Sequence, residues 1–119
     1  VREAVRTLPV QAQAVLVALD KLSEEDGRQS HRTGEIFQRY QEVAKRSGLR
    51  VLTARRVSDL CSELDVMGLA GGKVVSHGRG GRTTELALNV DHETLVDLVK
   101  KDPALKEVFG WTAERSKRA

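Results

Sequence analysis

Residues 53–88 decide the fold, and they read TARRVSDLCSELDVMGLAGGKVVSHGRGGRTTELAL. In the first part of this stretch, apolar residues recur every three or four positions, which predicts an amphipathic helix over residues 53–67. Gly68 stands where a glycine commonly ends a helix. The predicted inward face of this helix holds Ala54, Val57, Leu60, Cys61, Leu64 and Met67.

After Gly68 the pattern changes to that of a β-hairpin. Residues 72–77 and 82–88 are predicted as two strands, and Leu86 and Leu88 fall on one face because strand residues alternate. Between the strands lies Gly78-Arg79-Gly80-Gly81. Three glycines around one arginine favour a tight turn without bulky side chains.

Two more helices are predicted before residue 53. Residues 10–22 carry apolar residues at helical spacing behind Pro9, which suits a first turn. Residues 23–30 form a predicted polar loop, and a short strand is expected near 29–31. Thr33 is predicted to cap the next helix, which ends at Ser47-Gly48.

After the hairpin, a last helix is predicted from Asp91, with Pro103 breaking it. The order of helix, short strand, two helices and hairpin is that of a winged helix, an α+β and mainly helical fold. We expect residues 1–8 to be a linker from an upstream domain, 9–109 the winged-helix domain, and 110–119 a tail. The chain begins with Val rather than Met, which agrees with a fragment of a longer protein.

Composition excludes several classes of protein. At 39% hydrophobic and 31% charged residues, the chain is too apolar for disorder and too polar for a membrane span. Cys61 is the only cysteine, so no internal disulfide is possible, and the three scattered histidines suggest no metal site. A site that binds single-stranded nucleic acid by stacking its bases on aromatic side chains is also disfavoured, because aromatic residues are 3% of the chain.

The net charge of +3 is unevenly distributed. Residues 28–56 carry eight basic and two acidic residues, a net +6, and residues 73–90 carry a net +2. Residues 57–72, between them, carry three acids and no base. This pattern agrees either with one basic face that binds nucleic acid or with an ordinary solvated surface.

In a winged helix, the helix before the hairpin enters the major groove of DNA with its N-terminal residues nearest the bases. Here those residues are Thr53, Arg55 and Arg56. Arginine binds guanine O6 and N7 with two hydrogen bonds, while threonine suits phosphate. Arg79, between glycines, is slender enough for the narrow minor groove.

Simpler interpretations exist for these residues. Arg55 and Asp59 are four residues apart and could form a surface ion pair, and residues 78–81 could be only a flexible turn. Cys61 is expected to be a buried thiol, His31 and His77 edge or solvent residues, and His92 an ordinary early-helix residue. The chain contains no nucleophile elbow, P-loop or zinc-protease motif, so catalysis is not predicted.

Several motifs together resemble one known module. They are Leu8-Pro9 before the first helix, Thr33-Gly34-Glu35-Ile36, Met67-Gly68-Leu69, and Gly78-Arg79-Gly80-Gly81-Arg82-Thr83 before Glu85-Leu86-Ala87-Leu88. The chain is similar over residues 8–102 to the C-terminal winged-helix domain of the archaeal origin-recognition and cell-division-control replication initiators.

The resemblance implies binding of double-stranded DNA at replication origins. In that family the third helix would enter the major groove and the wing, which is the β-hairpin, the minor groove. The resemblance therefore assigns major-groove contacts to Thr53, Arg55 and Arg56. It assigns minor-groove contacts to Arg79, Gly80 and Arg82. The basic segments around them add four further candidate DNA-binding residues: Thr33, Lys45, Arg50 and Lys73.

The resemblance also implies properties of a longer protein. An upstream ATPase domain would hold ATP and Mg²⁺, so no cofactor and no metal are expected in this chain. The replicative helicase would be a further partner, and the protein would be cytoplasmic and nucleoid-associated, with no membrane contact. Two alternatives to a replication initiator remain, a winged-helix transcription regulator and a winged helix that binds an acidic protein.

Overall fold

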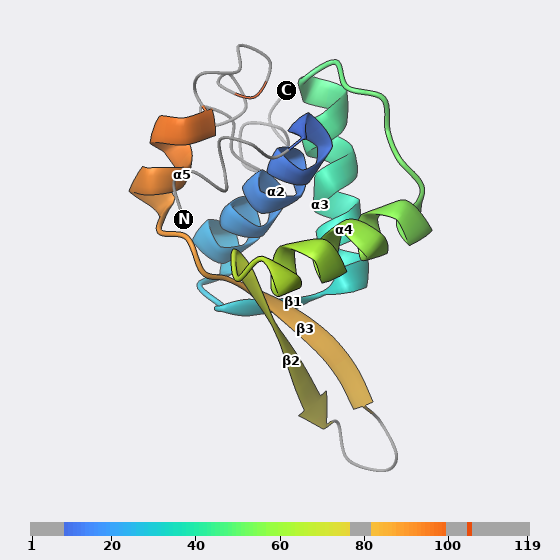
Figure 1. Cartoon of the computed structure of the whole chain (residues 1–119), viewed down its shortest axis with the longest axis vertical. Coiled ribbons are helices and arrows are strands. Elements are labelled where there is room, and N and C mark those ends of the chain that lie inside the picture. The colour runs from blue at the N-terminus through green and yellow to red at the C-terminus, as the bar shows by residue number, and fades with distance from the viewer. Residues whose placement is uncertain (1–8, 77–81, 100–104, 106–119) are drawn as a thin grey trace.

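The computed structural model describes residues 9–76, 82–99 and 105, and for residues 73–76, 82–84 and 97–98 it describes the backbone only. Its elements follow the predicted order and form a winged helix, mainly helical with a small antiparallel sheet (Figure 1). The elements are α2 (Val10–Asp26), β1 (Ser30–Arg32), α3 (Thr33–Arg46), α4 (Ala54–Val66), β2 (Ala70–Ser76), β3 (Arg82–Leu88) and α5 (His92–Val99). The predicted linker 1–8, the hairpin turn with His77, Pro103 and the tail 110–119 lie outside the described residues.

The first helix, α2, is the centre of the core. Its residues 14–22 are buried on every side, as expected for a helix covered by neighbours all round. It is longer than predicted, because the polar residues 23–26 continue it as a last exposed turn. It ends at Gly27, whose φ of 73° no other residue type adopts as readily, and the Gly27 N–H donates to the Ser23 carbonyl at 2.9 Å.

The second helix, α3, begins differently from the prediction. Thr33 is its first residue and not its cap, because Arg32 before it is still extended and pairs with Glu85 of the sheet. The Arg32 N–H is satisfied instead by Glu35, whose Oε1 accepts it at 3.0 Å. The helix end was predicted correctly, since Gly48 follows it with a φ of 71°.

The three strands form a sheet in the order β1-β3-β2. β2 and β3 pair antiparallel from Ala70 opposite Leu88 to Ser76 opposite Arg82, so the predicted hairpin is confirmed and begins two residues earlier than expected. β1 pairs with the base of β3. His31, the middle residue of the edge strand β1, is fully buried with Nε2 2.9 Å from Asp26 Oδ2. It is therefore an edge-strand residue, as one of the two predicted alternatives had it, but it does not face solvent.

The core is aliphatic, as the composition predicted, with Tyr40 as its one fully buried aromatic among the described residues. Asp91 caps α5, accepting the Thr94 N–H at 3.3 Å, and Leu95 packs inward. Met67 was predicted to face the core and instead is 45% exposed, because it lies just past the end of α4.

In the described part of the chain, no helix has the length and apolar character needed to cross a membrane.

Candidate nucleic-acid interface

The first turn of α4 is a capped helix end. Thr53 precedes it in an extended conformation, and Thr53 Oγ1 accepts the Arg56 N–H at 3.3 Å. The N–H groups of Ala54 and Arg55 have no acceptor within the helix, because the first N–H groups of an α-helix point beyond its end. These donors, at the positive end of the helix dipole, suit a phosphate oxygen.

The two arginines of this turn are available to a ligand. Arg55 and Arg56 are exposed. Across residues 9–76 and 82–99, the structure pairs neither guanidinium with an acid, so the alternative of an Arg55–Asp59 ion pair is not observed. Positive charge is therefore concentrated in the first turn of α4, one turn before Asp59.

A buried tyrosine holds the connection that leads into this turn. The Tyr40 hydroxyl donates to Gln11 Oε1 at 2.7 Å and accepts the Leu52 N–H at 2.9 Å. Gln11 Nε2 in turn donates to the Arg50 carbonyl at 2.7 Å. The residues just before Thr53 are thereby tied to both α2 and α3, which defines where α4 begins.

Replacing Tyr40 with phenylalanine is expected to lower the free energy of unfolding by about 1–3 kcal/mol. The ring stays packed, but the Leu52 N–H and Gln11 Oε1 lose their partner in a partly buried place. Urea unfolding followed by circular dichroism measures the effect. Gln11→Ala should add less in the Tyr40→Phe background than in the wild type, because both changes break the same network. Strict additivity of the two changes would contradict this coupling.

The charge of residues 28–56 is partly neutralised in three dimensions. Arg28 Nη2 lies 2.8 and 2.9 Å from the two carboxylate oxygens of Glu35. Arg39 Nη2 lies 2.7 Å from Glu25 Oε1, and Glu25 lies before residues 28–56 in the chain. At least two of the eight basic residues are thus paired with acids, so the basic surface is smaller than the charge count along the chain suggested.

Of the other predicted residues that the structure describes, Lys45 does not lie on the same part of the surface as the hairpin. Lys45 is exposed in the last turn of α3, and Arg50 is exposed in the connection to α4. Figure 1 shows that end of α3 at the opposite end of the molecule from the outer end of the hairpin. Lys45 is therefore remote from the hairpin residues.

The hairpin holds four other predicted residues. Lys73 of β2 lies opposite Glu85 in the ladder, and Arg82 begins β3 opposite Ser76. Arg79 and Gly80 lie outside the described residues.

A polar groove of about 310 Å³ separates α4 from the base of the hairpin. Thr33 lines it, half-buried, together with Ser58 and Ser62, whose side chains are exposed. The two serines were not predicted as site residues, although they follow Arg55 at i+3 and i+7 and therefore share its helix face. Hydroxyl groups at these positions can donate to base edges, whereas the carboxylate of Asp65, which lines the same groove, disfavours phosphate there.

Cys61 borders the same groove and is buried, as predicted. Burial raises the pKa of its thiol to about 11. The sulfur therefore stays protonated at neutral pH, which agrees with a packing residue and not with a nucleophile.

Comparison with known proteins identifies the fold family. The model of the family described as "CDC6, C terminal winged helix domain" matches residues 3–98. The chain is 44% identical over 103 residues to the ORC1-type DNA replication protein 1 of Aeropyrum pernix, which is 87% of this chain and 26% of that protein. It is 40% identical over 107 residues to the ORC1-type DNA replication protein of Pyrococcus abyssi, 90% of this chain and 25% of that protein.

A solved structure shows the same architecture. The structure of the Aeropyrum pernix ORC1 protein in complex with DNA superposes with a TM-score of 0.77 and 40% identity, covering 90% of this chain and 28% of that one. The chain thus spans about a quarter of the length of these relatives. It belongs to the CDC6 C-terminal winged-helix family, the winged-helix domains of ORC1- and CDC6-type DNA replication initiators.

Proposed function

We propose that this chain binds double-stranded DNA at replication origins, as the winged-helix module of an initiator protein. The observation that supports the proposal is the first turn of α4, where a capped helix end exposes Arg55 and Arg56, and neither arginine has an acidic partner among the described residues. The DNA complex of the Aeropyrum pernix relative supports the same use of this fold.

In the proposed complex, the N-terminal end of α4 lies in the major groove. Arg55 and Arg56 reach base edges, where a guanidinium can bind guanine O6 and N7 together. Thr53 and the free N–H groups of the first turn hold a phosphate, which sets the depth and direction of the helix. Acidic residues follow along α4 at Asp59 and Glu63, both exposed, so phosphate is repelled from its second half.

The hairpin is proposed to contact the minor groove beside this site. Arg79 enters it between glycines, and Gly80 allows the backbone to approach closely. Arg82 and Lys73 lie on the two strands that lead to the turn and bind the flanking phosphates, as does Arg50 before α4. Thr33 adds a hydroxyl at the groove between α4 and the sheet. Lys45 meets phosphate only where the duplex extends along α3.

We further propose that the whole protein carries an upstream ATPase domain. ATP and Mg²⁺ would bind there, and this chain would need neither for its own DNA contacts. Helicase recruitment and a cytoplasmic location at the nucleoid are proposed on the same grounds, since the relatives are DNA replication proteins about four times as long.

The salt dependence of duplex binding tests the proposal. Titrating the 119-residue chain with labelled duplex between 50 and 200 mM salt should give a plot of log K against log salt with a slope of about −4 to −5, if four to six phosphates are contacted. Fluorescence anisotropy measures the binding. Absence of duplex binding at 50 mM salt would refute DNA binding and favour a protein partner with an acidic surface.

A further inference from the structure

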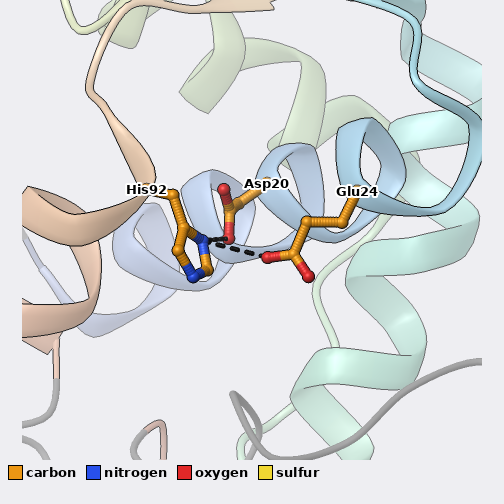
Figure 2. Close-up of side chains that lie close together, drawn as sticks. All are labelled: Asp20, Glu24 and His92. Carbon is orange, nitrogen blue, oxygen red and sulfur yellow. Dashed lines mark hydrogen bonds and ion pairs between the residues drawn. The ribbon is translucent and has the colours of Figure 1, made fainter.

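α2 and α5 are joined by an imidazole between two carboxylates (Figure 2). His92 Nδ1 lies 2.7 Å from Asp20 Oδ2 and 2.9 Å from Glu24 Oε1. Asp20 and Glu24 are four residues apart on α2, so they project from the same face of the helix. One nitrogen and two oxygen atoms are thereby brought within 4.8 Å of one another.

One ring nitrogen of His92 faces two carboxylates in this cluster. A histidine Nδ1 carries at most one hydrogen, yet two carboxylates converge on it. The Asp20 side chain is only 5% exposed, and burial raises the pKa of its carboxyl to about 6, although His92 opposes the rise. His92 Nδ1, Asp20 Oδ2 and Glu24 Oε1 are thus three potential ligand atoms gathered at one place.

We propose that Asp20, Glu24 and His92 form a site for a divalent transition-metal ion of the Zn²⁺ type. Imidazole nitrogen and carboxylate oxygen are ligands that Zn²⁺ accepts, and three protein ligands leave a fourth position for water. The ion replaces the proton between His92 and the two acids. Mg²⁺, which prefers six oxygen ligands, fits this set poorly.

The geometry requires little movement to accept the ion. Ligands at about 2.0–2.2 Å around a tetrahedral zinc are separated from each other by about 3.3 Å, so the nitrogen and each oxygen would move apart by about half an ångström. His92 and Glu24 can do this, because their side chains are 50% and 44% exposed. Lys21, buried next to Asp20 on α2, is the opposing feature, since its ammonium would repel the ion; its burial lowers its pKa.

The role of such an ion would be structural. It would link the first turn of α5, which follows the hairpin, to the central helix α2. Figure 1 shows α5 on the opposite side of the molecule from the N-terminal end of α4, so the site is separate from the proposed DNA contacts. An ion bound only by the folded chain raises the stability of the fold.

Isothermal titration of the 119-residue chain with ZnCl₂ and with MgCl₂ tests the site. We expect one Zn²⁺ per chain, no comparable Mg²⁺ binding, and a higher thermal midpoint with Zn²⁺. His92→Gln and Glu24→Gln should each weaken Zn²⁺ binding by at least about tenfold. Glu93→Gln, which removes the neighbouring exposed acid of α5, should leave it unchanged. Binding should also weaken as the pH falls, because protons compete with the ion for its ligands.

Two results would overturn the proposal. One is a folded wild-type chain that binds no Zn²⁺ at pH 7, which would leave the cluster as an ion pair. The other is unchanged Zn²⁺ binding in His92→Gln, which would place the ion elsewhere. Circular dichroism verifies that each variant is folded, and the absorption of bound Co²⁺ reports a nitrogen and oxygen ligand set directly. Duplex binding, measured on the same variants, should not change.

Discussion

Replacing both Arg55 and Arg56 with alanine is expected to remove most of the preference of this chain for its target duplex over an unrelated one. Each arginine that reaches a guanine contributes about 1–3 kcal/mol of discrimination, which is about 5- to 150-fold in affinity. Both side chains are exposed on the first turn of α4, and among the described residues neither has an acidic partner to lose. Competition anisotropy with a selected duplex and a scrambled one measures the ratio.

Two matched variants separate base reading from simple charge. Lys45→Ala removes one positive charge at the end of α3 that is remote from the hairpin, and it should change the discrimination little. Asp59→Ala removes an acid one turn from Arg55 and should leave binding unchanged or strengthen it. Undiminished affinity and discrimination in the double arginine variant would show that α4 does not read the DNA in this orientation.

Replacing Leu64 with alanine is expected to lower the free energy of unfolding by about 2–5 kcal/mol. Leu64 is fully buried on the inward face of α4, so the change removes contacts and leaves a cavity that the surrounding helices can fill only in part. Because domains of this size are stable by only about 5–15 kcal/mol, much of the stability would be lost. Urea unfolding of the purified chain measures the difference.

Val66→Ala is the control on the same helix. Val66 is 89% exposed, and its replacement should change the free energy of unfolding by less than about 0.5 kcal/mol. The two changes have the same chemical character, so the contrast depends on burial. Equal losses in both variants would mean that α4 packs by a face other than the one seen in the structure.

The order of elements could be predicted because each is specified by nearby residues. The spacing of apolar residues in 53–67 and the alternation in 82–88 repeat over short distances, and Gly48 and Gly68 have the positive φ expected at helix ends. The predictions were wrong where a residue distant in the sequence determines the local conformation. Thr33 is not a cap because Arg32 is held extended by pairing with Glu85, more than fifty residues away.

The candidate site also has features that the sequence predicts and features that depend on distant residues. The position of Thr53, Arg55 and Arg56 at the exposed start of α4 could be predicted from the sequence, because a helix that follows a tight connection exposes its first turn. Their contact with DNA stays a prediction. The partners of other basic residues could not be predicted from the sequence. Arg39 is neutralised by Glu25, which belongs to a segment counted as separate along the chain.

The sequence by itself determined the winged-helix order, the aliphatic core and the two arginines at the start of α4, because periodicity, caps and glycines act over one or two turns. Only the tertiary structure decided which charges remain available. It buried His31 against Asp26, placed the Tyr40 hydroxyl under the connection to α4, and brought His92 to Asp20 across 72 residues. These contacts depend on how helices and strands pack, and packing joins residues whose separation along the chain carries no local signal.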